Sequence, residues 1–268
     1  GIADPRLHEA LPPGAGTRDR DRMTTALITG GNRGLGRATA LALAGAGLDV
    51  VVTYRVHAEE ARDVVDRIEA LGRRAAALPL DVGDPSTFPA FRSALRAHLP
   101  DGRLDVLVNN AGSALYRGLD AVTEPEVDRV VAEHLKGPLF LTQAIADLLA
   151  DGARVVNVSS ALTRITLAGS GPYASAKAAV EALTRYQALE LAPRVITVNV
   201  VAPGAVPTDF GDGHLREDPQ LQEAVTQSTA LGRLATPGDV ADAITGLVTA
   251  SGSWVTGQRI EASGGLRL

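Results

Sequence analysis

Tyr173 and Lys177 have the side-chain types and the spacing needed for proton transfer to a carbonyl oxygen. A free tyrosine has a pKa of about 10 and is a poor acid at neutral pH. A lysine four residues later lies one helical turn away on the same face, where its charge favours the tyrosinate. Lys177 is one of only two lysines in the chain, with Lys136, although 26 residues are basic. The pair predicts an acid–base site, and the alternative is an ordinary amphipathic helix.

Two serines end a strand-like run shortly before this tyrosine. Ser159 and Ser160 follow the residues Val155-Val156-Asn157-Val158. Adjacent residues of a strand face opposite sides, so we expect the two serine hydroxyls to lie in different surroundings.

A glycine-rich loop follows the first strand-like run. The loop reads Thr29-Gly30-Gly31-Asn32-Arg33-Gly34-Leu35-Gly36 and runs directly into a helical pattern. Glycine permits a tight turn and lets a pyrophosphate approach the N-terminus of a helix, where free N–H groups bind anions. The spacing differs from Gly-x-Gly-x-x-Gly, and the alternative is a turn without a ligand. Its position after the first strand favours a nucleotide-binding loop.

Strand-like runs alternate with helical patterns along the rest of the chain. Several runs are apolar on both faces, which is typical of central parallel strands. Thr123 and Glu126 are spaced as a capping box at a helix start. The alternation predicts one α/β domain over 23–268, a Rossmann-type doubly wound parallel sheet flanked by helices, with ligands beyond the carboxyl ends of the strands. The expected strands are Thr25–Thr29, Asp49–Tyr54, Ala75–Leu80, Leu104–Val108, Arg154–Val158, Val195–Val201 and Gln258–Glu261, and the expected helices cover 35–46, 58–71, 86–98, 124–149, 172–192 and 238–250.

The composition argues against several other classes of protein. The 268 residues include no cysteine, so we expect neither disulfides nor thiolate metal sites, and no metal is predicted. A net charge of −5 without blocks of like charge argues against nucleic-acid partners. No apolar run reaches about 18 residues, which argues against a membrane span and suits a cytoplasmic location. Residues 1–22 are expected to be a disordered tail, because they are rich in proline, glycine and charge and have no apolar period. The alternative is a segment ahead of the native start, because Met23 is the only methionine.

Three motifs in this order resemble the short-chain dehydrogenase/reductase family. They are the glycine loop, Asn109-Asn110-Ala111-Gly112 after the fourth strand, and Tyr173-x-x-x-Lys177, and the likeness runs from about Thr25 to Gly265. The family's extended branch would need glycine at position 33, and Arg33 argues against it. The resemblance implies that Tyr173 is the general acid in reduction, that Lys177 lowers its pKa and binds the nicotinamide ribose, and that Ser160 rather than Ser159 positions the carbonyl.

The end of the second strand predicts which cofactor is preferred. Members of the family that prefer NAD usually carry an acid there, whereas this chain has Tyr54 followed by Arg55. A guanidinium can hold the 2′-phosphate of NADP by a charge-assisted fork. Arg33 can flank the same phosphate from the glycine loop. These two arginines favour NADP(H) over NAD(H).

The resemblance also assigns cofactor contacts to the loops after the other strands. Asp81 matches the family's adenine-contacting aspartate, although Asp-Val at a strand end equally fits a helix-entry turn. Asn109 matches the residue that fixes the fourth strand beside the cofactor. The full set of expected cofactor-binding residues is Gly30, Asn32, Arg33, Gly34, Leu35, Gly36, Tyr54, Arg55, Asp81, Val82, Asn109, Ala111, Gly112, Tyr173, Lys177, Pro203, Gly204, Val206 and Thr208.

His134 departs from the family pattern. The family's fourth catalytic residue is usually the asparagine of Asn-Leu-x-Gly, and this chain reads His134-Leu135-Lys136-Gly137. An imidazole can also bridge a water or a backbone carbonyl to the lysine, so His134 is a further catalytic candidate. The alternative is a histidine packed within a helix.

These features predict an NADP(H)-dependent oxidoreductase that interconverts a ketone and a secondary alcohol. A 3-oxoacyl thioester or related carbonyl is the first candidate substrate, because 231–234 and 237–241 resemble 3-oxoacyl-thioester reductases. A substrate lid is expected at about 205–236. The run 254–261 resembles the family's edge strand and interface, which implies a homodimer or homotetramer. The alternatives are an NAD-dependent sugar or polyol dehydrogenase and a catalytically silent cofactor-sensing regulator, against which the intact Ser160, Tyr173 and Lys177 argue.

Overall fold

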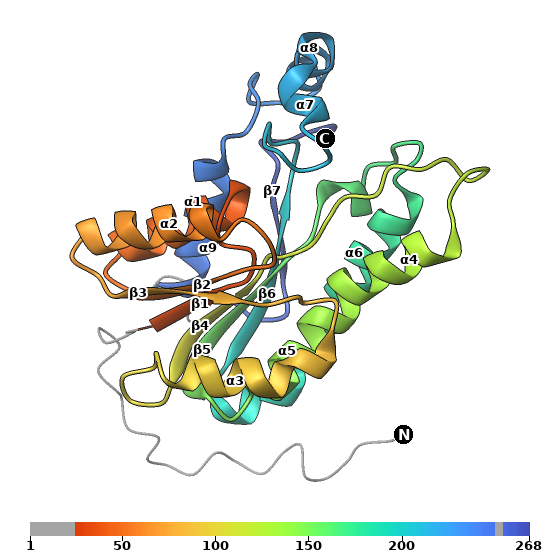
Figure 1. Cartoon of the computed structure of the whole chain (residues 1–268). Helices are drawn as coiled ribbons and strands as arrows, with labels where there is room; N and C mark the ends of the chain where they lie inside the picture. Colours follow the sequence, from red (N-terminus) through yellow and green to blue (C-terminus); the bar gives the residue numbers. More distant parts are fainter. Residues whose placement is uncertain (1–24, 250–253) are drawn as a thin grey trace.

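A seven-stranded parallel sheet forms the centre of the molecule (Figure 1). The computed structural model describes residues 25–249 and 254–268, so the predictions for residues 1–22 lie outside it. The strand order β3-β2-β1-β4-β5-β6-β7 reverses direction between β1 and β4, which is the switch point of a doubly wound sheet. The predicted Rossmann-type fold is therefore confirmed. The strands are β1 (Thr25–Ile28), β2 (Asp49–Tyr54), β3 (Ala75–Pro79), β4 (Leu104–Asn109), β5 (Leu149–Val158), β6 (Thr197–Pro203) and β7 (Arg259–Ala262).

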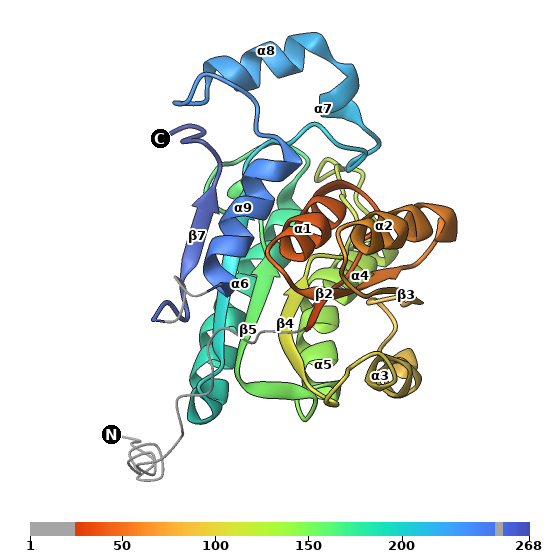
Figure 2. The same ribbon diagram turned by 90° about the vertical axis from the view of Figure 1, so that its left-hand side faces the viewer.

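Helices cover both faces of the sheet, as the crossovers between parallel strands require. Helices α1, α2 and α9 lie on one face, and α3, α4, α5 and α6 lie on the other (Figures 1 and 2). The α-helices are α1 (Gly34–Gly45), α2 (Ala58–Ala70), α3 (Phe88–Arg96), α4 (Glu124–Val131), α5 (Gly137–Ala144), α6 (Gly171–Leu191), α7 (His214–Glu217), α8 (Pro219–Gln227) and α9 (Pro237–Val248), and the short 3-10 helices are η2 (Pro85–Thr87), η4 (Ala161–Thr163) and η5 (Ala192–Arg194).

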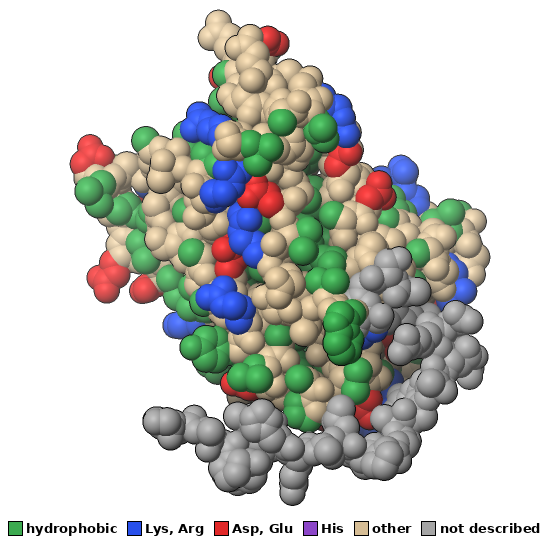
Figure 3. Space-filling view, turned by 180° about the vertical axis from the view of Figure 1, so that it is seen from behind, with side chains coloured by type: hydrophobic (Ala, Val, Ile, Leu, Met, Phe, Trp, Pro, Cys, Tyr) green, Lys and Arg blue, Asp and Glu red, His purple; other side chains and the backbone are tan. Residues whose placement is uncertain are grey.

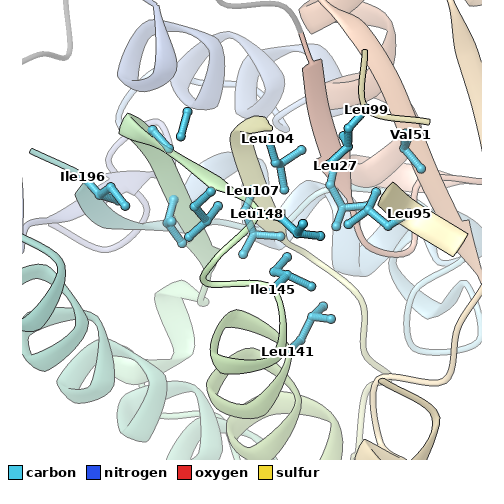
Figure 4. Packing of buried hydrophobic residues seen from close by; sticks show 14 of the residues in the cluster. Leu27, Val51, Leu95, Leu99, Leu104, Leu107, Leu141, Ile145, Leu148 and Ile196 are labelled. Carbon is cyan, nitrogen blue, oxygen red and sulfur yellow. The ribbon is translucent and has the colours of Figure 1, made fainter. Parts of the chain in front are cut away.

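Two hydrophobic clusters fill the layers above and below the sheet. Side chains alternate along a strand, so Leu27 packs in the cluster under α3, α5 and α6, whereas Ile28 packs in the cluster under α1, α2 and α9. Figure 4 shows the first cluster, which includes Leu107 on β4, Leu141 on α5 and Ile145 at the end of α5. Burial on both faces explains why the central strands are almost uniformly apolar, and it makes the strand ends rigid supports for a site.

The prediction of one continuous helix over 124–149 is wrong in two respects. The observed helical segment is interrupted by a π-helical turn, Ala132–Lys136, and it ends at Ala144. Pro138 has no N–H to donate to the carbonyl four residues earlier, which accounts for the break in the regular ladder. Strand β5 then begins at Leu149 rather than 154, because the left-handed Gly152 lets the chain bulge beside β4.

The segment between β6 and α9 contains two helices that the sequence patterns did not reveal. Helices α7 and α8 stand beyond the carboxyl ends of the strands (Figures 1 and 2). The turn before them has left-handed backbone at Gly211, Asp212 and Gly213. The substrate lid expected at about 205–236 stays a prediction.

The surface has charged and apolar regions. Basic and acidic side chains alternate down the middle of the face in Figure 3. An apolar groove of about 470 Å³ runs between α4 and α6, lined in part by Leu119, Val127 and Leu135. The predicted homodimer or homotetramer stays a prediction. Among the described residues, no helix has the length and apolarity to cross a membrane, and no cluster of three metal-ligating side chains occurs.

Candidate active site

Tyr173 and Lys177 lie in the first two turns of α6 and are both buried. Pro172 in the first turn suits a helix start. An N–H at this position would have no intrahelical partner, so proline loses no hydrogen bond by lacking one. The ammonium of Lys177 donates to the carbonyl of Val158 at 2.7 Å, and its Nζ lies 5.7 Å from the centre of the Tyr173 ring. The helix is therefore fastened to the carboxyl end of β5 by the lysine itself.

Ser160 and Ser159 face different surroundings. Ser160 is the N-cap of η4, and its Oγ accepts a hydrogen bond from the N–H of Leu162 at 3.2 Å. Its hydroxyl lies near enough to the Tyr173 phenol to lower the pKa of that phenol. Ser159 is buried and donates to Glu181 at 2.7 Å. The structure thus brings Ser160 and Tyr173 together, and it turns Ser159 away from them.

Burial sets the protonation of the tyrosine and the lysine. Desolvation raises the pKa of Tyr173, nearby Tyr116 raises it further, and the hydrogen bond with Ser160 acts in the opposite direction. Desolvation lowers the pKa of Lys177 to about 7, and the carboxylate of Glu133 opposes this shift. At neutral pH the phenol is protonated and can donate a proton, while the lysine titrates near the working pH.

His134 lies in the π-helical turn, against the ring of Tyr173. The two ring centres are 5.2 Å apart in an edge-to-face arrangement. Nε2 is 2.7 Å from the carbonyl oxygen of Ser113, which can only accept, so Nε2 carries the proton. Nδ1 is buried without a hydrogen-bond partner among the described residues. Burial, aided by the charge of Lys177, holds the pKa of His134 well below its usual range, so the imidazole is neutral.

Gly112 makes room for this imidazole. A Cβ at position 112 would overlap the ring of His134. The ring is therefore held between Gly112 and Tyr173, with an unused acceptor atom. The relay role of His134 stays a prediction, and so does its alternative, a histidine packed within a helix.

The glycine loop and α1 form a cradle for an anionic ligand. Helix α1 begins after Arg33 without a side-chain cap or an acid in its first turn, so its N–H groups are open to a phosphate. A Cβ on Gly36 would strike the carbonyl of Gly30 and lie 2.6 Å from Nδ2 of Asn110, so only glycine fits there. Asn110 in turn donates to the carbonyls of Thr29 and Gly30 and fixes the turn. These residues fit a dinucleotide pyrophosphate.

Other predicted cofactor residues take structural roles at the strand ends. Asn109 is buried and donates to Asn157 at 2.8 Å, which fastens β4 to β5. The N–H of Ala111 donates to the hydroxyl of Thr29. Asn32 donates to Glu60 on α2, so its amide is directed away from α1. Leu35 packs against the core beneath α1, and Val82 is buried.

The two residues expected to read the adenosine end differ in exposure and contacts. Asp81 accepts a hydrogen bond from the N–H of Gly83 at 2.8 Å, which is the helix-entry turn considered as its alternative. Arg55 is half exposed and contacts the buried Glu133 through Nη1 at 2.9 Å. Glu133, which the sequence patterns did not single out, also accepts from the N–H of Ser113. Arg55 directly follows Tyr54, which is partly buried. Because Glu133 contacts only Nη1 of Arg55, the other N–H groups of the guanidinium are available to a ligand.

The opposite side of the site comes from the segment after β6. Thr208 lies 3.9 Å from where a Cβ on Gly34 would be, so this segment reaches the glycine loop. Val206 packs against the core beneath α1, and Thr208 accepts from the N–H of Phe210. The buried Pro203 ends β6, and Gly204 directs the chain toward this segment.

Two aromatic residues border the phenol of Tyr173, and neither was predicted as a site residue. The Phe210 ring centre lies 5.8 Å from that of Tyr173. Tyr116 packs against Gly211, whose Cβ would lie 2.7 Å from its ring. Tyr116 is 41% and Phe210 44% exposed, so both rings are open to a ligand. The sequence could have indicated them as site residues, because both lie in loops that follow the carboxyl ends of strands β4 and β6, where ligands of such sheets bind.

The chain matches one protein family over most of its length. The sequence profile described as "Enoyl-(Acyl carrier protein) reductase" matches residues 30–267. An uncharacterized oxidoreductase of Methylorubrum extorquens is 37% identical over 243 residues, 90% of this chain and 97% of that protein.

Solved structures of two ketoreductases are also similar to the chain. The promiscuous reductase LugOII of lugdunomycin biosynthesis, described as catalysing keto-reduction at C1, is 37% identical, with a TM-score of 0.86 over 92% of this chain and 99% of that one. The angucycline C-6 ketoreductase LanV, solved with bound NADP, is 36% identical, with a TM-score of 0.85 over 91% of this chain and 95% of that one. LanV has also been solved with NADP and rabelomycin.

Proposed function

Because the chain belongs to the short-chain dehydrogenase/reductase family, we propose that it reduces a ketone to a secondary alcohol with NADPH. The observation that carries the proposal is the meeting of a protonated, buried phenol, the hydroxyl of Ser160 and the ammonium of Lys177 at one strand end. A carbonyl oxygen gains negative charge during reduction, and this is the set of donors that it needs.

Each residue has a distinct part in this proposal. The bound nicotinamide supplies a hydride to the carbonyl carbon. Ser160 donates to the carbonyl oxygen and orients it, and Tyr173 gives that oxygen its proton. Lys177 stabilises the tyrosinate that is left, since opposite charges in a dry site attract strongly. The neutral imidazole of His134 would accept a hydrogen bond at Nδ1 from a water that links it to Lys177, and protons would reach the lysine through that water.

NADP(H) is the preferred cofactor. Similar structures such as LanV contain NADP. The sequence positions of Arg33 and Arg55 support a role in binding the 2′-phosphate, because a guanidinium can hold a phosphate by a charge-assisted fork. The second strand also ends without an acid that would repel this phosphate. Together these observations support NADPH over the NAD-dependent alternative.

The entrance of the site favours an aromatic ketone over the 3-oxoacyl thioester expected first. Tyr116 and Phe210 offer half-exposed rings beside the phenol, and aromatic pairs stabilise flat ligands by stacking. LugOII and LanV are both described as ketoreductases, which fits a ketone as the reacting group. The segment 205–236 would close over such a substrate as a lid.

A substrate panel tests the proposal directly. NADPH consumption is measured with polycyclic aromatic ketones, diketones, quinones and 3-oxoacyl thioesters, each repeated with NADH. NADH formation is measured with sugars and polyols in the presence of NAD, and NADPH binding is titrated separately. Turnover of ketones with NADPH supports the proposal. Turnover confined to sugars or polyols with NAD would support the alternative dehydrogenase, and tight NADPH binding without any turnover would support a cofactor sensor.

The pH profile of ketone reduction should show the titration of Lys177. We expect kcat/KM to fall as the pH rises through about 7, because the lysine loses the charge that stabilises the tyrosinate. Glu133 favours the protonated lysine, so Glu133→Gln should move this alkaline limb to lower pH. Glu124→Gln removes an exposed acid from α4 and is the control. If the alkaline limb of the kcat/KM profile stays at the same pH in Glu133→Gln, the assignment of that limb to Lys177 is contradicted.

A pair of substitutions at His134 tests the relay. His134→Asn keeps a polar side chain with an acceptor and should retain turnover within about threefold, whereas His134→Leu should lower it by about tenfold or more. The measurement is kcat at saturating NADPH, with the melting temperature recorded for both variants. Equal turnover in the two variants would show that the imidazole only packs.

A further inference from the structure

Glu181 is a charged residue of the catalytic helix that the proposed proton transfer does not use. It follows Tyr173 and Lys177 at intervals of four residues, so the three side chains share one face of α6. Its side chain is only 14% exposed. A carboxylate at this depth needs several donors, because an unpaired charge is costly to bury.

Two of the donors flank Ser160. Ser159 donates to Oε1 of Glu181 at 2.7 Å, and Thr163 donates to the same oxygen at 2.8 Å. Thr163 ends η4, the single turn that begins after Ser160. Both flanks of Ser160 are therefore held against the helix that carries Tyr173.

A chain of alternating charges continues from Glu181 to the last strand. Arg259 on β7 contacts Glu181 through Nε at 2.9 Å and Glu261 through Nη1 at 2.9 Å. Arg164, the residue after η4, donates from Nε to Glu261 at 2.9 Å. Hydrogen bonding to Arg164 lowers the pKa of Glu261 to about 2, so that carboxylate remains ionised. The turn that follows Ser160 is thus bound at two points, one on α6 and one on β7.

We propose that Glu181 is a positioning residue that sets the Ser160 hydroxyl beside the Tyr173 hydroxyl, acting through Ser159 and Thr163. Arg259 holds the carboxylate in place. The proposal rests on the proposed ketone reduction, in which both hydroxyls must meet one carbonyl oxygen. Misplacement of a reacting group by about 1 Å can lower the rate about 10²-fold, so a device that fixes this distance matters.

The substitution Glu181→Gln tests this role with little change in shape. The amide keeps the length of the side chain but loses the charge-assisted bonds to Ser159, Thr163 and Arg259, which are about twice as strong as neutral ones. We expect kcat for ketone reduction to fall by about tenfold, with the Kd of NADPH unchanged. Glu190→Gln, on the exposed side of the same helix, should leave kcat unchanged.

The decisive comparison repeats the substitution without the serine hydroxyl. In a Ser160→Ala background, Glu181→Gln should lower kcat by less than about twofold, because no hydroxyl is left to position. Similar losses in both backgrounds would overturn the proposal and indicate general structural support. Should Glu181→Gln not fold, Arg259→Gln carries the same comparison in the two backgrounds.

The outcome also separates this inference from the function on which it rests. If the wild-type protein reduces no ketone with NADPH, the proposed function fails. If the wild type is active and Glu181→Gln keeps its full kcat while binding NADPH normally, the positioning role alone fails.

Discussion

Replacing Tyr173 with phenylalanine is expected to lower ketone turnover by about 10²- to 10⁴-fold, the usual contribution of a positioned acid–base group. The substitution removes only the hydroxyl and its bond with Ser160. The ring remains, and so do its contacts with His134 at 5.2 Å and Phe210 at 5.8 Å between ring centres. The Kd of NADPH and the melting temperature should therefore change little.

Tyr186→Phe is the matched control for this experiment. Tyr186 lies on the same helix with 65% of its surface exposed, so losing its hydroxyl should not affect turnover. Single-turnover rates with saturating NADPH measure both variants. Full activity in Tyr173→Phe would overturn the assignment of the acid, and equal losses in both variants would indicate damage to the helix instead.

The elements that hold this tyrosine could be predicted because their signals are local. The strands have uniformly apolar runs since both faces are covered, and the Tyr173–Lys177 interval has meaning as soon as a helix is assumed. The glycine loop is equally local, since the close approach of Gly36 to Gly30 occurs within one turn. Each of these features depends on neighbours within a few residues.

Features that depend on distant partners could not be predicted in this way. Arg55 and Glu133 are 78 residues apart and meet only because β2 and α4 end beside one another. Glu181 and Arg259 likewise meet across 78 residues. The helices α7 and α8 had no recognisable apolar period, and neither contains a buried residue. A helix without a buried face lacks the pattern on which sequence analysis relies.

The pairing of Arg55 with Glu133 also changes how cofactor preference should be tested. Replacing Arg55 with aspartate would remove a phosphate ligand, but it would also place a second carboxylate beside the buried one. Like charges at this distance repel, so such a variant would disturb the π-helical turn as well as the cofactor. Serine removes the guanidinium without adding charge, and it is the better substitution.

Replacing both Arg33 and Arg55 with serine should raise the Kd of NADPH by about 100-fold. Hydrogen bonds to charged groups contribute about 1.5–3 kcal/mol each, and about 1.4 kcal/mol corresponds to a tenfold change in Kd. The Arg55–Glu133 contact uses one of the five N–H groups of a guanidinium, so Arg55 can still bind a phosphate while it is held. NADH has no 2′-phosphate and should bind the double variant about as well as the wild type.

The Kd values of NADPH and NADH are measured by titration for the wild type, the double variant and the control Arg67→Ser. Arg67→Ser removes a half-exposed arginine from α2 and controls for the loss of positive charge alone. A rise in the Kd of NADPH confined to the double variant, with the Kd of NADH unchanged, assigns the 2′-phosphate to the two arginines. If NADPH and NADH weaken equally, Arg55 acts only by neutralising Glu133, and the preference for NADP(H) must come from other residues. The assignment of Tyr173 as the acid would stand after that outcome, because it rests on the contacts of Tyr173 with Ser160 and Lys177 rather than on the two arginines.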